Sequence, residues 1–286
     1  MSISGYVKLA RPVNSLMIGF AVLVGEAVAA SSVRMELATL MGYLTGVFIT
    51  SFSMIVNDVL DYEVDKANGA RRPLVEGTAT IGGAKAAAAV LLLAGLITSS
   101  YTGVHTLAVA AAFAALATLY NWKLKERGFS GNVVVALSMM IPFIYGGLLV
   151  QGWRVDPLLD LMALTAFLAG VGREVVKGIA DVEGDSLRNV RSLARTRGEA
   201  FASKVGSAFF LLAVGASLVP AIYGRVSVYY TFIVGSTDVL FLALALLVLL
   251  RHGKGDALKV KDFALFGMST GMLGFILEGL SRAVAT

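Results

Sequence analysis

Nine apolar runs follow one another along the chain, with short polar interruptions between them. Each run is close to the ~20 residues that an α-helix needs to cross the hydrocarbon core of a bilayer. The pattern predicts transmembrane helices at about residues 13–32, 37–57, 84–103, 105–121, 131–151, 158–177, 201–223, 228–250 and 262–281. The first run is too long for a removable signal peptide, and Pro12 just before it suits a helix start.

Composition supports this interpretation. Hydrophobic residues make up 57% of the 286 residues and charged residues 15%, whereas soluble domains average about 45–50% and about 25%. The mean hydropathy is +0.79. The chain contains no cysteine, which excludes disulfides, thiol nucleophiles and cysteine-ligated metal clusters. We therefore expect an all-α, polytopic membrane protein with nine transmembrane helices.

Basic residues are distributed unevenly between the expected loops. Of the 24 Lys and Arg residues, only Arg34, Arg154, Arg225 and Arg282 fall on the side opposite the amino terminus. The positive-inside rule then places the amino terminus in the cytoplasm and the carboxyl terminus outside. The net charge of +5 is explained by this orientation, and we expect no nucleic-acid partner.

The first of two acidic segments ends the second expected span and reads NDVLDYEVD at residues 57–65. On an α-helix, Asn57, Asp58, Asp61 and Asp65 project within an arc of about 100°. Three carboxylates this close repel one another unless a cation lies among them or water dilutes the repulsion. Oxygen ligands without His or Cys suit Mg²⁺, which ordinarily shares its coordination shell with substrate phosphates.

The second acidic segment follows the sixth expected span and reads GREVVKGIADVEGD at residues 172–185. If the helix continues through it, Arg173, Lys177, Asp181 and Asp185 occupy one stripe of about 120°. Its glycines leave that continuation open. Two carboxylates and two cations on one stripe could hold a second Mg²⁺ and contact diphosphate oxygens directly. The alternative for each segment is a solvated helix end with mixed charges. The presence of two such segments at matching depth makes this alternative less favourable.

These segments resemble the two aspartate-rich motifs of the UbiA superfamily of intramembrane prenyltransferases, which follow helices two and six of nine. Within the superfamily they look most like those of archaeal digeranylgeranylglyceryl phosphate synthases. The resemblance implies a single domain over residues 1–286, with the helices around a central cavity that opens to the cytoplasmic side. The implied partners are Mg²⁺, geranylgeranyl diphosphate and geranylgeranylglyceryl phosphate, within a membrane and without an obligatory protein partner.

The resemblance also implies roles for individual residues. The first metal ion would be held by Asn57, Asp61 and Asp65. The second would be held by Asp181 and Asp185. The implied diphosphate contacts are Arg72, Arg173 and Lys177. The residues expected to be catalytic are Asp58, Asp61 and Asp181, with Asp58 or Glu174 as possible acceptors of the substrate proton and the released diphosphate as the alternative.

Four further residues are candidates for substrate binding. The family places a Tyr and Lys pair at the end of helix four, but YNWKLK at residues 120–125 departs from the YxxxK spacing of quinone-pathway members. Tyr120 with either Lys123 or Lys125 could serve, and an interfacial aromatic belt with snorkelling lysines is the alternative. Asn14 is a candidate for the acceptor pocket, or for a bond to a neighbouring helix, because an amide inside a span costs free energy unless it is partnered.

Additional cations could bind the phosphate of the acceptor, although attraction to anionic lipid also explains them. They are Lys8, Arg11, Arg188, Arg191, Arg195 and Arg197.

Two other functions share some of these features. An aromatic prenyltransferase of quinone or haem biosynthesis would use the same donor and metal sites with a different acceptor. A cation transporter could use intramembrane carboxylates, but the acidic segments lie at one membrane face and the Arg and Lys stripe would repel a transported cation.

Overall fold

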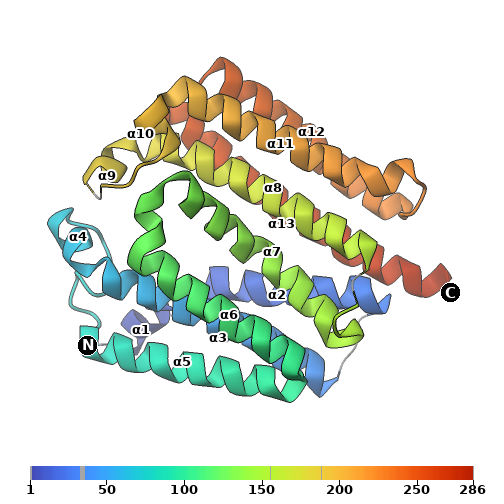
Figure 1. The fold of residues 1–286 in the computed structure, drawn as a ribbon, viewed down its shortest axis with the longest axis horizontal. Coiled ribbons are helices and arrows are strands. Elements are labelled where there is room, and N and C mark those ends of the chain that lie inside the picture. Colours follow the sequence, from blue (N-terminus) through green and yellow to red (C-terminus); the bar gives the residue numbers. More distant parts are fainter. Residues whose placement is uncertain (1, 33–35, 155, 188, 286) are drawn as a thin grey trace. The chain divides into compact units, whose positions relative to one another are not determined.

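The computed structural model describes residues 2–32, 36–154, 156–187 and 189–285, and all regular secondary structure in these ranges is helical (Figure 1). The long helices there are α2 (Pro12–Ala30), α3 (Leu37–Leu60), α5 (Ile81–Thr102), α6 (Val104–Leu119), α7 (Phe129–Gln151), α8 (Pro157–Ala180), α11 (Glu199–Ile222), α12 (Val228–Leu250) and α13 (Lys254–Ala285). The short ones are α1 (Ile3–Leu9), α4 (Tyr62–Ala67), α9 (Val182–Leu187), α10 (Leu193–Arg197), the π-helical turn η1 (Tyr120–Leu124) and the 3₁₀ turn η2 (Lys125–Arg127).

The long helices coincide with the expected spans. Within the described ranges, eight helices are long and apolar enough to cross a membrane, if α6 is counted together with η1 and η2 to Arg127. Helix α8 matches the remaining span in position and has 24 residues, but it carries Arg173, Glu174 and Lys177 near its end. The largest difference is at α13, which begins at Lys254 and not near residue 262. The prediction of an all-α, polytopic membrane protein is confirmed.

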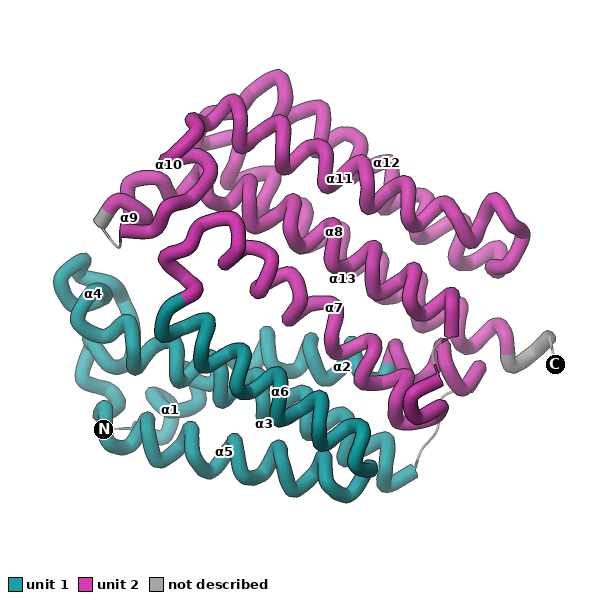
Figure 2. The backbone as a smooth tube through the Cα atoms, viewed as in Figure 1, with its two compact units in different colours: residues 1–23, 34–123 teal, residues 24–33, 124–286 magenta. Residues whose placement is uncertain are grey.

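The chain forms two compact units (Figure 2). Unit 1 comprises residues 1–23 and 34–123, and unit 2 comprises residues 24–33 and 124–286. The single domain expected over residues 1–286 stays a prediction.

Unit 1 is built around α3, which packs against α5 and α6. Hydroxyl groups join its helices: the Thr45 and Thr98 hydroxyls lie 2.8 Å apart, and the Ser51 hydroxyl donates to the Ser15 hydroxyl at 3.0 Å. Within a bilayer there is no hydrophobic driving force between helices, so close packing and such bonds hold them together. Helix α3 is thereby fixed along its length, and its end carries the first acidic segment.

Unit 2 is built around α8, which packs against α7, α11 and α13. Its contact with α11 is close because a Cβ at Gly172 would lie 2.7 Å from the Phe210 ring and 3.0 Å from the Gly206 carbonyl oxygen. Val171, Val175 and Phe210 belong to one buried apolar cluster beside this contact. The end of α8, with the second acidic segment, therefore extends from a rigid helix pair.

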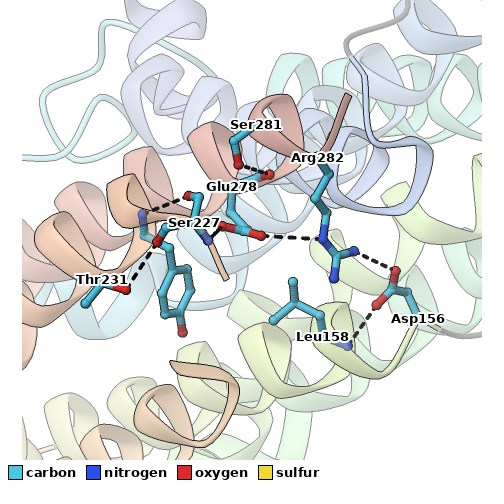
Figure 3. Close-up of polar contacts among 8 residues, drawn as sticks. Asp156, Leu158, Ser227, Thr231, Glu278, Ser281 and Arg282 are labelled. Carbon is cyan, nitrogen blue, oxygen red and sulfur yellow. Dashed lines mark hydrogen bonds and ion pairs between the residues drawn. The ribbon is translucent and has the colours of Figure 1, made fainter. Parts of the chain in front are cut away.

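A buried ionic cluster joins three segments of unit 2 at the end of α13 (Figure 3). Glu278, which is 1% exposed, accepts a hydrogen bond from the Ser227 backbone N–H at 2.7 Å and lies 3.4 Å from Arg282 Nε. Arg282 Nη1 donates to Asp156 at 3.1 Å, and Asp156 caps the first turn of α8 by accepting from the Leu158 N–H at 2.8 Å. The cluster ties the start of α8 and the start of α12 to the end of α13.

We expect Glu278→Ala to lower the free energy of unfolding by roughly 2–4 kcal/mol, because it leaves the Ser227 N–H without its acceptor and removes one of the two carboxylates paired with Arg282. Thermal unfolding of the purified protein in detergent measures this. Asp262→Ala is the matched control on the same helix, because the Asp262 side chain is 72% exposed and its loss should change stability by less than about 0.5 kcal/mol. Equal unfolding temperatures for the two variants would contradict a stabilising role for the cluster.

Candidate active site

The first acidic segment lies where α3 ends in unit 1. The regular helix is interrupted at Asp61, the residue between α3 and α4, which stays in the right-handed helical region but has a ψ of −2°, well away from the value of about −42° in a regular α-helix. Hydrogen bonding nevertheless continues through the junction: the Asp61 N–H donates to the Asn57 carbonyl at 2.9 Å, and the Asp65 N–H donates to the Asp61 carbonyl at 2.8 Å. The spacing of one helical turn between Asn57, Asp61 and Asp65 is therefore kept.

Two guanidinium groups compensate the charge of this segment. Asp58 is 3% exposed and accepts a hydrogen bond from Arg11 Nη2 at 2.6 Å. Arg72 lies between two carboxylates, with Nη1 4.0 Å from Asp58 and Nε 3.8 Å from the buried Asp65. Arg72 is thus beside the acidic segment, as expected. Arg11 was expected only as one of several loop cations, and its position before Pro12 gave no signal for this pairing.

Asn57 is oriented by a residue that the sequence analysis did not single out. Its Nδ2 donates to Asn121 Oδ1 at 2.8 Å, and Asn121 lies in the π-helical turn η1, a kind of turn often found at functional sites. Because Nδ2 is used in this bond, Oδ1 is the atom of Asn57 that can bind a cation. The expectation that Asn57 is a metal ligand is chemically compatible with this geometry.

The other substrate-binding candidates lie in η1, at the start of η2 and on α2. Lys123 Nζ lies 4.1 Å from the centroid of the Trp122 ring, a cation–π contact of the kind found at membrane interfaces. Tyr120 is half-buried in the same turn, and Asn14 is exposed on α2. Lys125, the first residue of η2 in unit 2, is also half-buried. Their roles in substrate binding stay predictions.

The second acidic segment, in unit 2, has the same backbone design. Helix α8 ends at Ala180 and α9 begins at Val182, so the helix is interrupted at Asp181, which has φ −99° and ψ 9°. The Asp181 N–H donates to the Lys177 carbonyl at 3.1 Å, and the Asp185 N–H donates to the Asp181 carbonyl at 2.8 Å. The interruption is at the aspartate and not at either glycine of the segment.

The two segments are a local repeat with an offset of 120 residues. In both, a 24-residue helix ends at an aspartate that precedes a six-residue helix. In both, the carbonyl of the second aspartate then accepts an N–H from five residues further on, at 2.9 Å for Asp65 and 2.8 Å for Asp185. A residue with positive φ precedes that donor in each case, Gly69 at 60° and Asn189 at 53°.

Asp61 and Asp181 occupy the carboxyl-terminal caps of these helices. The negative end of the helix dipole and the last carbonyl groups of the helix lie there, so an ionised carboxylate is electrostatically unfavourable unless a cation is close. The repeat therefore supplies two positions at which a cation would be stabilised.

In unit 2 a buried carboxylate holds the two predicted diphosphate contacts. Glu174 is 7% exposed and accepts from Arg173 Nη1 at 2.7 Å and from Lys177 Nζ at 3.1 Å. Arg173 Nε is buried and has no hydrogen-bond partner among the described residues. A guanidinium with an unused buried donor is prepared to bind an anionic oxygen.

A third cation of unit 2 lies at the acidic segment, and the sequence alone did not indicate it. Lys254 Nζ donates to Glu183 Oε2 at 2.6 Å, and this hydrogen bond and the charge of Lys254 lower the pKa of the Glu183 carboxyl. The two residues are 71 positions apart, so only the fold reveals their proximity.

The described residues contain no group of three or more His, Cys, Asp or Glu side chains arranged to hold a metal ion. A cation at either segment would thus need other oxygen ligands. An amide oxygen such as that of Asn57 and phosphate oxygens of a substrate complete the shell of Mg²⁺ in many enzymes that use nucleotides or diphosphates. The donor set fits Mg²⁺ held jointly by protein and substrate. Arg188 lies outside the described residues.

The fold and the repeated acidic helix ends define a polytopic membrane protein with sites suited to phosphorylated substrates. The chain belongs to the UbiA prenyltransferase family, whose model matches residues 18–270. The expected resemblance to this family is confirmed.

Archaeal relatives match nearly the full chain. Digeranylgeranylglyceryl phosphate synthase of Archaeoglobus fulgidus is 39% identical over 282 residues, which are 96% of this chain and 96% of the relative. Digeranylgeranylglyceryl phosphate synthase of Methanopyrus kandleri is 30% identical over 272 residues, which are 95% of this chain and 97% of the relative.

Solved structures agree with the fold. A digeranylgeranylglyceryl phosphate synthase structure superposes with a TM-score of 0.82 at 26% identity and covers 98% of this chain and 99% of that chain. A UbiA homologue from Archaeoglobus fulgidus bound to DMAPP and Mg²⁺ superposes with a TM-score of 0.70 at 18% identity, covering 99% and 100%, and at that identity it supports the fold alone.

We expect Asp58→Asn to lower the free energy of unfolding by roughly 2–4 kcal/mol, because the substitution removes the charge that compensates the partly buried Arg11. Thermal unfolding in detergent tests this. Glu63→Gln, at an exposed position of the same segment, should leave the unfolding temperature nearly unchanged. A stable Asp58→Asn variant would show that the Arg11 pair does not hold the segment together.

Proposed function

We propose that this protein is a Mg²⁺-dependent prenyltransferase that moves a geranylgeranyl group from its diphosphate to the hydroxyl of geranylgeranylglyceryl phosphate. The product would carry the second ether bond of an archaeal membrane lipid. The observation that carries the proposal is the repeated helix end with an aspartate cap, in a family member whose archaeal relatives bear that activity in their names. The membrane location fits two substrates with long isoprenoid chains.

In this reaction the allylic C–O bond of the donor breaks, the diphosphate leaves with the bonding electrons, and the acceptor hydroxyl oxygen bonds to the allylic carbon. Mg²⁺, when bound, would neutralise the diphosphate and stabilise the negative charge that grows on it. Asn57, Asp61 and Asp65 are the proposed ligands at the first segment, and Asp181 and Asp185 at the second.

The basic residues beside each acidic segment would bind diphosphate oxygens. Arg72, Arg173 and Lys177 are each held by carboxylates, so their positive charges are in place before the substrate arrives. Groups that need no reorganisation stabilise a charged transition state more effectively than water does. Since the charge on diphosphate increases as the bond breaks, these contacts favour the transition state over the bound substrate.

The acceptor proton is best assigned to the diphosphate released in the same step. Asp58 accepts a 2.6 Å hydrogen bond from Arg11, and Glu174 accepts from both Arg173 and Lys177. The oxygens of both carboxylates are thus already engaged by cations of the protein. We therefore propose that Asp58 and Glu174 hold the basic residues in place, while Asp61 and Asp181 bear the metal-dependent chemistry.

The apolar helices would complete the site. An allylic cation is destroyed by water, and a hydrocarbon environment both binds a C20 chain and excludes water from the reacting carbon. The distribution of Lys and Arg places the acidic segments and the amino terminus on the cytoplasmic side in this proposal, with the carboxyl terminus outside.

The acceptor is identified by supplying purified protein with labelled geranylgeranyl diphosphate, Mg²⁺ and either geranylgeranylglyceryl phosphate or 4-hydroxybenzoate. We expect a prenylated product with the glyceryl phosphate alone. Transfer to the aromatic acid alone would move the function to an aromatic prenyltransferase and overturn the proposed acceptor.

Asp61→Ala and Asp181→Ala should each reduce transfer by at least a hundredfold, because each removes a carboxylate that holds the metal and leaving group. Their unfolding temperatures should stay near that of the wild type, and Glu63→Gln should remain active. Chelation of divalent ions should stop turnover, and added Mg²⁺ should restore it. Near wild-type transfer by either Ala variant, or undiminished transfer in chelator, would contradict the assigned metal sites.

A further inference from the structure

Lys254 is the first residue of α13, and glycines lie on both sides of it. Its ammonium group donates to Glu183 at 2.6 Å and also interacts electrostatically with Asp181. Glu183 lies between Asp181 and Asp185, the proposed metal ligands of the second segment. The start of α13 thus places a positive charge at this segment.

The ion pair between Lys254 and Glu183 contributes little to the stability of the fold. The Lys254 side chain is 56% exposed and the Glu183 side chain 83% exposed. Ion pairs between exposed side chains contribute little to stability, because water and salt screen them and both side chains lose freedom. Lys254 can therefore exchange this partner at little cost.

The two predicted diphosphate contacts of unit 2 differ from Lys254 in the burial of their carboxylate partner. Arg173 and Lys177 share the buried Glu174, which stays with them and compensates part of their charge. The hydrogen-bond partner of Lys254 is the exposed carboxylate of Glu183, whereas a prenyl diphosphate presents several negative oxygen atoms. A lysine ammonium is a compact charge on a flexible stem, suited to follow a phosphate group that arrives and leaves.

We infer that Lys254 binds the diphosphate of the prenyl donor at the second acidic segment, and that it leaves Glu183 when the donor binds. This inference rests on the proposed function and adds a residue from the start of α13 to the donor site.

Steady-state transfer kinetics at saturating Mg²⁺ and acceptor, with the geranylgeranyl diphosphate varied, test the inference. Lys254→Gln should raise the KM for the donor roughly tenfold, the lower range for a hydrogen bond between charged groups. Lys254→Arg keeps the charge and should stay within about threefold of the wild type. An unchanged donor KM in Lys254→Gln overturns the inference.

Glu183→Gln separates diphosphate binding from a merely structural role. It removes the same ion pair but leaves Lys254 available, so the donor KM should be unchanged or lower. If Glu183→Gln raises the donor KM as much as Lys254→Gln does, Lys254 acts only by holding α9, and the inference is wrong. Lys259→Gln, which removes an exposed lysine of the same helix, should behave like the wild type.

Direct binding of inorganic diphosphate, measured by calorimetry with Mg²⁺ present, keeps this test independent of the acceptor. Lys254→Gln should bind it roughly tenfold more weakly than the wild type does. If the wild type transfers no prenyl group to geranylgeranylglyceryl phosphate but this difference is found, the proposed function fails and the inference stands. Equal affinities would overturn the inference whatever the acceptor is.

Discussion

The electrostatics of the long helices determines where this protein needs cations. A helix carries partial positive charge at its amino terminus and partial negative charge at its carboxyl terminus. Helix α8 has an aspartate at each end: Asp156 caps the first turn and accepts the Leu158 N–H, a favourable arrangement, whereas Asp181 stands at the unfavourable end. Helix α3 repeats the unfavourable arrangement at Asp61. Such positions are tolerated when a cation binds there, which is the physical reason for placing the proposed metal sites at these two helix ends.

The buried ion pairs follow from the same constraint. Desolvating a carboxylate is costly unless a cation is adjacent, and Asp58 and Glu174 each have an arginine within hydrogen-bond distance. These pairs fix the guanidinium groups beside the segments whose proposed metal ligands lie further along the chain. Asp58 and Glu174 can therefore have a different task from the proposed metal ligands of the same segments, because each of them accepts a short hydrogen bond from an arginine and holds it in place.

The sequence predicted the helices well because the bilayer imposes one length and one composition on every span. The spacing of the charged residues also located both acidic segments, since it follows the helical period. It did not predict the interruptions at Asp61 and Asp181, because hydrogen bonding across both junctions keeps that period. Nor could it find Asn121 beside Asn57 or Lys254 beside Glu183, since these contacts depend on how distant helix ends pack.

Unit 2 shows how polar groups for stability differ from polar groups for binding. Around Glu278, the carboxylate is bonded to the Ser227 N–H and paired with Arg282, and Arg282 reaches Asp156, so the cluster is closed on itself. At the other end of α8, Arg173 Nε is buried without a partner among the described residues, and Asp181 stands at the negative end of the helix. A completed network makes the structure rigid, whereas an incomplete one carries a free-energy cost that a ligand can remove. Binding of an anionic substrate and its cation at the end of α8 that bears the acidic segment would therefore remove this free-energy cost.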